Sequence, residues 1–302
     1  MYKYEILSGM KKTTFFSVGI ALLCLLQACR HNKVAVAEPD PVIVAETARL
    51  EEIEREIPAL KDYTDTIFGV PLEMVYVEGG TFTMGGIPGR DGNKIYGDEK
   101  PAHVVSLSSY YISRYPITQE LWEAVMGDNP SEFQDAKVPI SNVTQEEAIE
   151  FCIKINLISY QYYWLPTEAQ WEYAARGGNR SRGTLYSGSD ILPLVGCYCQ
   201  SAPCVIGQYK PNELGIYDMS GGIWEWCEDW FGEFPADTVF NPQGPEYGFH
   251  KVLKGGSWNS DARSCRISHR SGASLRTKAR IVGFRVVMRL PDRINPRLKT
   301  KN

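Results

Sequence analysis

Apolar and polar positions divide this chain into a short apolar run, a polar segment and a long remainder of mixed runs. The apolar run, Phe15 to Leu26, follows Lys11 and Lys12. It is long enough for an export signal but too short to span a bilayer comfortably. Beyond it, aromatic-rich runs such as Met74–Val77 end at Gly, Pro or Asn. This pattern predicts short strands joined by long loops.

Three segments of the remainder have helical patterns or helix-start signals. Thr144 and Glu147 have the spacing of a capping box, in which the two side chains satisfy free backbone N–H groups. Gly177 and Gly178 mark the end of the last segment, because glycine commonly terminates helices. We expect helices at Thr118–Met126, Thr144–Leu157 and Thr167–Ala175.

The polar segment before the remainder predicts a tether with one short amphipathic helix. Leu50, Ile53, Ile57 and Leu60 recur at helical spacing among charged residues. This helix would pack on the protein's own domain or bind a partner, and the sequence leaves both interpretations open.

Length and charge narrow the classes of function. A chain of 302 residues with 43% apolar content can bury one large domain and still leave a stalk. The formal net charge of -4 provides no broad basic surface. We therefore expect no nucleic-acid partner, and attachment to a membrane must come from another feature.

The apolar run ends in a sequence that suggests such an attachment. Leu26-Gln27-Ala28-Cys29 resembles a bacterial lipobox, in which Cys29 would receive diacylglycerol. Acyl chains bury enough methylene groups to hold a protein on a membrane. The alternative is an ordinary secretory signal with a coincidental cysteine. Both interpretations predict export.

Export gives the remaining cysteines an oxidising environment, in which disulfides form. Six cysteines allow many complete pairings, so the sequence alone establishes no bond. The densest group is Cys197, Cys199 and Cys204. Disulfides are the preferred interpretation of this group, because its spacing differs from a paired zinc site; a soft-metal site is the alternative. The cysteines concerned are Cys152, Cys197, Cys199, Cys204, Cys227 and Cys265.

Seven blocks of the remainder carry a family resemblance. In chain order they are MVYVEGGTFTMG, PAHVVSLSSYYISRYPITQELWEAVMG, PISNVTQEEAIEFC, LPTEAQWEYAARGG, PNELGIYDMSGGIWEWCEDW, KGGSW and GFRVV. Through them the body, from about Pro71 to Leu290, resembles the sulfatase-modifying-factor family. The resemblance implies the formylglycine-generating-enzyme fold. This is an irregular α+β, C-type-lectin-like domain with short strands, few helices and long ordered loops.

The resemblance also implies a structural calcium ion. The matching family positions supply side-chain oxygens from Asp218 and Glu225 and main-chain oxygens near Gly221 and Ile223. Hard oxygen ligands of this kind suit calcium. The chain departs from the family at Gly222, where asparagine is usual. The alternative is that the two acids are only hydrogen-bonding loop residues.

The family's catalytic pair is broken in this chain. The formylglycine-generating enzyme uses two cysteines after a GGS block to bind a cuprous ion and activate oxygen against a substrate cysteine. With Gly255–Trp258 aligned on that block, these positions fall on Ser260 and Cys265. A hydroxyl replaces a thiolate poorly as a copper(I) ligand, so we expect no ordinary copper site and no assured catalytic residue. Cys265 is then a buried small residue, a disulfide partner or an isolated reactive thiol.

Together these features favour a lipid-anchored protein of the bacterial cell envelope, exported and held at the outer membrane, facing the periplasm or the cell surface. Its domain would be a non-catalytic platform that binds envelope proteins, as in the gliding and secretion-associated lipoproteins that share it. One alternative is a divergent copper-dependent oxidase acting on a protein cysteine. Another is a lectin-like module that binds a glycan or peptide. The expected organisation is a lipoprotein signal at 1–29, a tether at 30–70, the family domain at 71–291 and a basic tail at 292–302.

Overall fold

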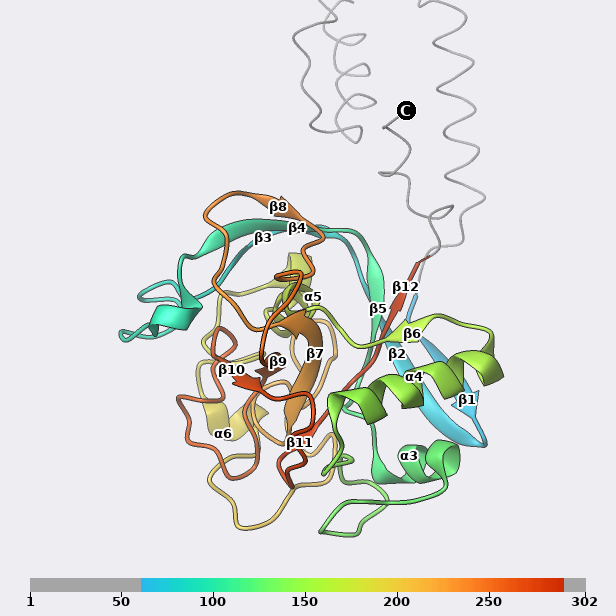
Figure 1. Ribbon diagram of the computed structural model, residues 1–302. Coiled ribbons are helices and arrows are strands. Elements are labelled where there is room, and N and C mark those ends of the chain that lie inside the picture. The colour runs from blue at the N-terminus through green and yellow to red at the C-terminus, as the bar shows by residue number, and fades with distance from the viewer. Residues whose placement is uncertain (1–60, 291–302) are drawn as a thin grey trace, which may run out of the picture. The chain divides into compact units, whose positions relative to one another are not determined.

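The computed structural model describes residues 61–290, which form one mixed unit of short strands, few helices and long loops (Figure 1). The lipobox, the amphipathic segment ending at Leu60 and the basic tail lie outside the described residues. Within 61–290, no helix combines the length and the apolar character needed to cross a membrane. The three sheets have the strand orders β1-β2-β5-β12-β6, β10-β9-β7-β11 and β3-β4-β8.

The five-stranded sheet is antiparallel throughout and spans the described chain from end to end. Its central pair, β2 and β5, is flanked by β12, so the last described strand lies beside early ones. Its members are β1 (Tyr63–Ile67), β2 (Val70–Val77), β5 (Tyr110–Ser113), β12 (Val287–Arg289) and β6 (Tyr163–Trp164).

Strand β1 corrects the expected start of the domain. Tyr63 to Ile67 pair with β2 through a two-residue turn at Phe68 and Gly69, both with positive φ. The tether was expected to continue to residue 70, but these residues form an edge of the sheet. Positive φ at both turn positions gives the twist that a tight hairpin needs, which explains why Gly69 is there.

The other two sheets build the remainder of the domain. In the four-stranded sheet β11 runs parallel to β7, and in the three-stranded sheet β8 runs parallel to β4. The first comprises β10 (Arg270–Ala273), β9 (Lys251–Lys254), β7 (Trp224–Trp230) and β11 (Val282–Gly283). The second comprises β3 (Gly80–Met84), β4 (His103–Leu107) and β8 (Val239–Phe240).

The three expected helices are present, each with the threonine that starts it. Thr118, Thr144 and Thr167 accept hydrogen bonds from backbone N–H groups in the first turns. Such caps satisfy donors that a helix cannot pair internally. The helices are α3 (Gln119–Met126), α4 (Gln145–Ser159), α5 (Glu168–Ala175) and the short α6 (Leu192–Val195), with 3₁₀ turns η2 (Gly97–Glu99) and η3 (Gly178–Arg180).

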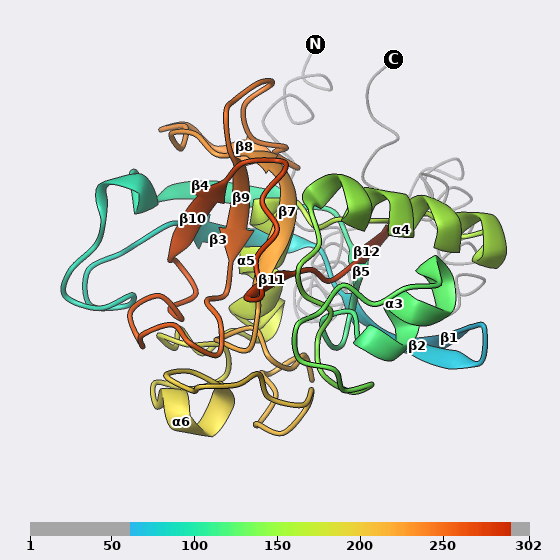
Figure 2. The ribbon, with the colours of Figure 1, turned by 60° about the horizontal axis from the view of Figure 1, so that its bottom comes forward.

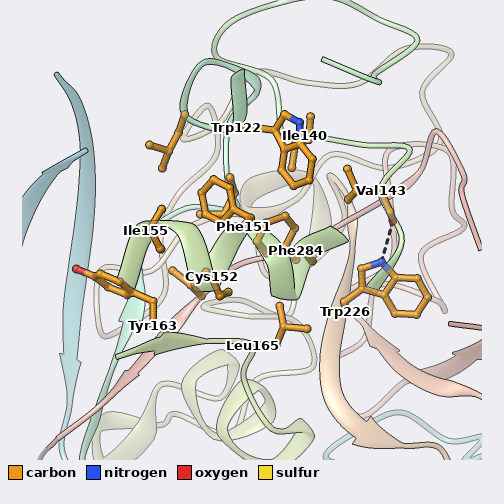
Figure 3. Packing of buried hydrophobic residues seen from close by; sticks show 14 of the residues in the cluster. Trp122, Ile140, Val143, Phe151, Cys152, Ile155, Tyr163, Leu165, Trp226 and Phe284 are labelled. Atoms are coloured by element: carbon orange, nitrogen blue, oxygen red, sulfur yellow. Dashed lines mark hydrogen bonds between the residues drawn. The ribbon is translucent and has the colours of Figure 1, made fainter. Parts of the chain in front are cut away.

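One hydrophobic core lies where α3 and α4 cover β1 and β2 (Figures 1 and 2). Trp122 stacks on Phe151 with ring centroids 5.6 Å apart, and Phe284 meets both rings edge-on. Figure 3 shows Trp226 reaching this core, where its indole N–H donates to the Val143 carbonyl at 3.0 Å. Trp226 therefore fixes a loop by packing and by one hydrogen bond, as large apolar groups with a polar edge do.

Candidate functional site: the cysteine-pair position, the acidic loop and a neighbouring cleft

The segment aligned with the family's cysteine pair begins at a tight glycine turn. Gly255 and Gly256 both have positive φ, and a Cβ on Gly256 would lie 2.8 Å from the Cys265 Sγ. The turn therefore requires glycine for both conformation and space. The turn leads into the segment that contains Ser260 and Cys265.

Ser260 does not present a free hydroxyl at the first cysteine position. Its Oγ accepts a hydrogen bond from the Ser257 N–H at 3.0 Å and lies 2.9 Å from the Ser257 Oγ. The hydroxyl thus stabilises the turn that follows Gly256. This contact gives Ser260 a structural role that needs no ionised side chain.

Cys265 is fully buried and is not in a disulfide in this structure. Its Sγ donates to the Asp261 carbonyl at 3.4 Å and packs among apolar residues that include Tyr186 and Leu192. Burial, together with the charge of Asp261, raises the pKa of this thiol to about 12. A thiol in this environment remains protonated and is a weak nucleophile. Among the three expectations for Cys265, the structure matches the buried small residue.

The dense cysteine group separates into one disulfide and one free thiol. Cys197 and Cys204 form a disulfide, as preferred from the sequence. Cys199, between them, is free and exposed. Its N–H and its Sγ both donate to the Ser260 carbonyl, at 3.0 and 3.4 Å. The loop therefore reaches the cysteine-pair position, which no sequence spacing had indicated.

The acidic loop expected to hold calcium contains two buried carboxylates. Glu225, on β7, is already bound by Arg285, with Nε 2.6 Å from Oε2 and Nη2 2.9 Å from Oε1. The Trp171 indole N–H also donates to Oε2 at 2.6 Å. Both oxygens of Glu225 therefore have partners within the protein, and Arg285 supplies one positive charge.

Asp218 is less completely compensated. Its Oδ2 accepts the Gly207 N–H at 2.8 Å, and among the described residues it has no ion pair within 4 Å. Burial raises the pKa of Asp218 to about 6, although the hydrogen bond from Gly207 and the charge of Arg285 act to lower it. Two buried carboxylates facing one guanidinium leave net negative charge, which a cation would offset.

The backbone of the loop is compatible with that cation. Asp218, Gly221 and Gly222 all have positive φ, which folds the chain tightly between Asp218 and Glu225. At Gly222 the left-handed conformation is one that asparagine also tolerates, which accounts for the family difference. Both Glu225 oxygens already have partners and the Gly221 carbonyl accepts the Ile223 N–H at 3.1 Å, so calcium binding through Asp218, Gly221, Ile223 and Glu225 stays a prediction.

Ligand clusters of three or more His, Cys, Asp or Glu side chains do not occur within residues 61–290. The calcium interpretation therefore depends on main-chain oxygens as well as on two acids. Main-chain oxygens are ordinary calcium ligands.

A buried charge network surrounds Lys254, the residue before the glycine turn, and it was not expected from the sequence. Lys254 is fully buried, with its Nζ 3.1 Å from Glu172 Oε2 and 3.8 Å from Glu168 Oε1. Glu172 also binds Arg176 at 2.8 Å. Burial acts to raise the pKa of Glu172, but the charges of Lys254 and Arg176 outweigh it and lower that pKa to about 2. The alternating charges offset the cost of placing ions in the core.

A cleft of about 530 Å³ opens beside this network. Its polar part contains Glu168, Asp229 and Arg270, and its walls include Phe234 and Phe240. Arg270 binds Glu168 Oε2 at 2.6 Å and stacks over the Phe234 ring at 4.1 Å. Glu168 Oε1 and Arg270 Nε are buried without a hydrogen-bond partner among the described residues. The cleft thus combines apolar walls with a buried ion pair, in which Glu168 Oε1 also lies 3.8 Å from the Lys254 ammonium.

These features define an irregular α+β domain of the C-type-lectin-like kind, with ordered loops around a modified cysteine-pair position. Residues 68–290 match the family model described as a sulfatase-modifying factor enzyme 1-like domain. The chain belongs to this family and has the formylglycine-generating-enzyme fold.

Individual relatives differ in how much of their length this chain covers. Chaperone protein LppX of Paenibacillus barcinonensis is 34% identical, over 65% of this chain and 82% of that protein. A formylglycine-generating enzyme of Thermomonospora curvata is 27% identical, over 70% of this chain and 92% of the enzyme. The serine/threonine-protein kinase pkn1 of Chlamydia pneumoniae is 29% identical, but the chain spans only 38% of the kinase.

A solved relative has the same fold. Treponema denticola variable protein 1 superposes with a TM-score of 0.69 at 28% sequence identity, over 77% of this chain and all of that protein.

Proposed function

We propose that this chain is a lipid-anchored envelope protein whose formylglycine-generating-enzyme-like domain is a non-catalytic binding or assembly platform. The observation that carries the proposal is the state of the cysteine-pair position. Ser260 replaces one thiol and its hydroxyl is held by Ser257, while the remaining thiol, Cys265, is buried and has a raised pKa. Copper(I) favours two accessible thiolates, so this pair does not fit the family's copper chemistry.

The name of one relative supports a binding role. The protein from Paenibacillus barcinonensis is named as a chaperone, a class that acts by binding other proteins. Its similarity to this chain extends over most of both sequences. A protein or peptide is therefore the first class of ligand to test.

The cleft supplies a location for such a ligand. Ligand pockets typically enclose several hundred Å³ and combine apolar walls with a few polar groups that orient the ligand. Here the lining combines the apolar side chains of Phe234 and Phe240 with the exposed Glu233 and Gln243, whose side chains can form hydrogen bonds. Peptide amides and sugar hydroxyls both supply matching donors and acceptors.

Copper(I) titration of the reduced chain tests the non-catalytic proposal. We expect no specific binding that depends on Cys265 and no oxygen-dependent oxidation of a thiol peptide. The Cys265→Ser variant should behave as the wild type does. Tight binding lost in Cys265→Ser, together with turnover, would instead establish a divergent copper-dependent oxidase.

Binding in the cleft requires a separate experiment, with a random peptide library and an oligosaccharide array as probes. We expect the selected probe to lose at least tenfold in affinity for Phe240→Ala, because Phe240 lines the cleft while remaining 53% exposed. Phe249→Ala is the matched control, since Phe249 is 92% exposed and does not line the cleft. Equal binding by the two variants would place the ligand elsewhere, and a selected sugar rather than a peptide would favour the lectin-like function.

A further inference from the structure

Two loops from distant parts of the sequence meet beside the modified cysteine-pair position. The Cys199 N–H donates to the Ser260 carbonyl at 3.0 Å, and the Gln200 N–H donates to the Trp258 carbonyl at 2.6 Å. These two hydrogen bonds join the loop closed by the Cys197–Cys204 disulfide to the turn that leads to Cys265. The junction is made by main-chain groups, so it does not depend on side-chain rotamers.

The junction brings two free thiols to consecutive carbonyl groups. Cys199 Sγ donates to the Ser260 carbonyl and Cys265 Sγ to the Asp261 carbonyl, each at 3.4 Å. Burial raises the pKa of the Cys265 thiol, and the charges of Asp261 and Cys199 raise it further. Cys152 and Cys227, the other free thiols of residues 61–290, are buried.

The two thiols differ in accessibility, and this difference gives them separate chemical roles. Cys199 is exposed and lies on the outer loop, whereas Cys265 is enclosed by the turn and by the apolar cluster behind it. An oxidant in solvent therefore meets Cys199 first. Cys265 can react only with a group that is already within the site.

We propose that Cys199 and Cys265 form an oxidation-responsive dithiol, in which Cys199 is the attacking thiol and Cys265 the resolving thiol. The oxidant is a small organic disulfide. The Cys199 thiolate attacks one of its sulfurs, the disulfide bond of the oxidant breaks, and one thiol leaves. Cys265 then loses its proton and attacks the Cys199 sulfur, releasing the second thiol. The protein loses two electrons and two protons, and the oxidant is reduced to two thiols.

The bond has a defined structural consequence. It would connect the disulfide-closed loop covalently to the turn after Gly256, where at present main-chain hydrogen bonds join them. Oxidation would then hold the loop covalently against the cysteine-pair position. This property is independent of the binding function proposed above, because it concerns neither the cleft nor any copper chemistry.

Oxidised glutathione provides the test on the full chain. After acid quenching, alkylation of free thiols and digestion with trypsin, we expect peptide Gly183–Lys251 to be linked to the tripeptide Ser264–Arg266, because Pro211 blocks cleavage after Lys210. The link should disappear with dithiothreitol. Because the buried thiol attacks slowly while protonated, the linked form should accumulate faster as pH rises.

Three variants separate the roles of the thiols. Cys265→Ser should stop at a glutathione adduct on Cys199, and Cys199→Ser should reduce the linked form at least tenfold. Cys152→Ala, a buried cysteine outside the junction, should behave as the wild type does. A wild-type chain that stops at the Cys199 adduct, that exchanges Cys199 into the Cys197–Cys204 bond, or that links Cys265 equally well in Cys199→Ser would overturn the proposal.

Discussion

Lys254 shows how a single side chain can determine whether the centre of the domain is stable. Its ammonium group is fully buried between Glu168 and Glu172. Replacing it with methionine preserves much of the volume but leaves two carboxylates without that cation. Removing one partner from a buried ion pair typically costs about 3–5 kcal/mol. We expect Lys254→Met to lose about this much free energy of unfolding, measured by urea denaturation.

The matched control for this prediction is an exposed lysine in a simple pair. Lys137 lies 2.6 Å from Glu120, and its side chain is 56% exposed. Lys137→Met should cost less than about 1 kcal/mol, because water screens exposed ion pairs. Equal losses in the two variants would show that the buried network does not stabilise the core.

The buried carboxyl group of Asp229 gives a second prediction at the residue scale, which concerns how the free energy of unfolding depends on pH. Burial, followed by the charge of Glu168, raises the pKa of Asp229 from 3.8 to about 8. The folded chain therefore holds this proton more tightly than the unfolded chain does. The contribution of this proton to the free energy of unfolding is fully present below pH 3.8 and declines as pH rises toward 8.

The Asp229→Asn variant should remove this decline. Asparagine retains an oxygen acceptor for the Glu168 N–H, which donates to Asp229 at 2.8 Å. Between pH 5 and pH 8 the wild type should lose at least about 1 kcal/mol of unfolding free energy relative to the variant, since one unit of pKa difference is about 1.4 kcal/mol. If the unfolding free energies of the wild type and of Asp229→Asn changed with pH in parallel, the prediction would be contradicted.

At the scale of elements, local sequence signals predicted the helices and most of the strand-rich character. Thr144 with Glu147 predicted the start of α4, because a capping box depends only on neighbouring residues. Strand β1 was missed because its turn, Phe68-Gly69, lacks the Asn or Asp that usually marks a tight hairpin. Short-range signals therefore succeed where the interaction is itself short-range.

The candidate site depends on contacts that no local signal contains. Alignment on Gly255–Trp258 located Ser260 and Cys265, but Cys199 reaches them from a loop about sixty residues earlier. Lys254 looks like an ordinary polar strand residue until the buried acids of α5 face it. Sequence identified the residues of the cysteine-pair position, while the fold determined which other groups join it.

The acidic loop between Asp218 and Glu225 gives a prediction at the element scale. If the loop binds calcium, saturating calcium should stabilise the wild type by about 1–3 kcal/mol, observed as a rise in melting temperature over a chelated sample. Magnesium should have little effect, because it requires a smaller octahedral site. Asp218→Asn should abolish the response, whereas Asp237→Asn, at an exposed position, should retain it. Equal responses of the two variants to calcium would remove this loop as the binding site.

At the scale of the whole molecule, the domain combines rigid loops with a retained family fold and a modified cysteine-pair position. Buried aromatic side chains such as Trp122 and Trp226 fix loops that have little regular hydrogen bonding of their own. A scaffold of this kind can retain its shape while the residues of one position change. This is consistent with a platform function, because binding requires a stable surface rather than a complete set of catalytic residues.

The proposed lipid anchor at Cys29 supplies the last prediction. Cys29→Ser should move the exported chain from the membrane fraction to the soluble fraction and prevent incorporation of labelled palmitate, because a serine hydroxyl cannot form the thioether to diacylglycerol. Cys24→Ser, within the apolar run, is the matched control and should remain membrane-bound and labelled. If the wild type is also soluble and unlabelled, the segment is an ordinary secretory signal and the platform is a free exported protein. If Cys29→Ser remains in the membrane fraction without label, another part of the chain provides the attachment.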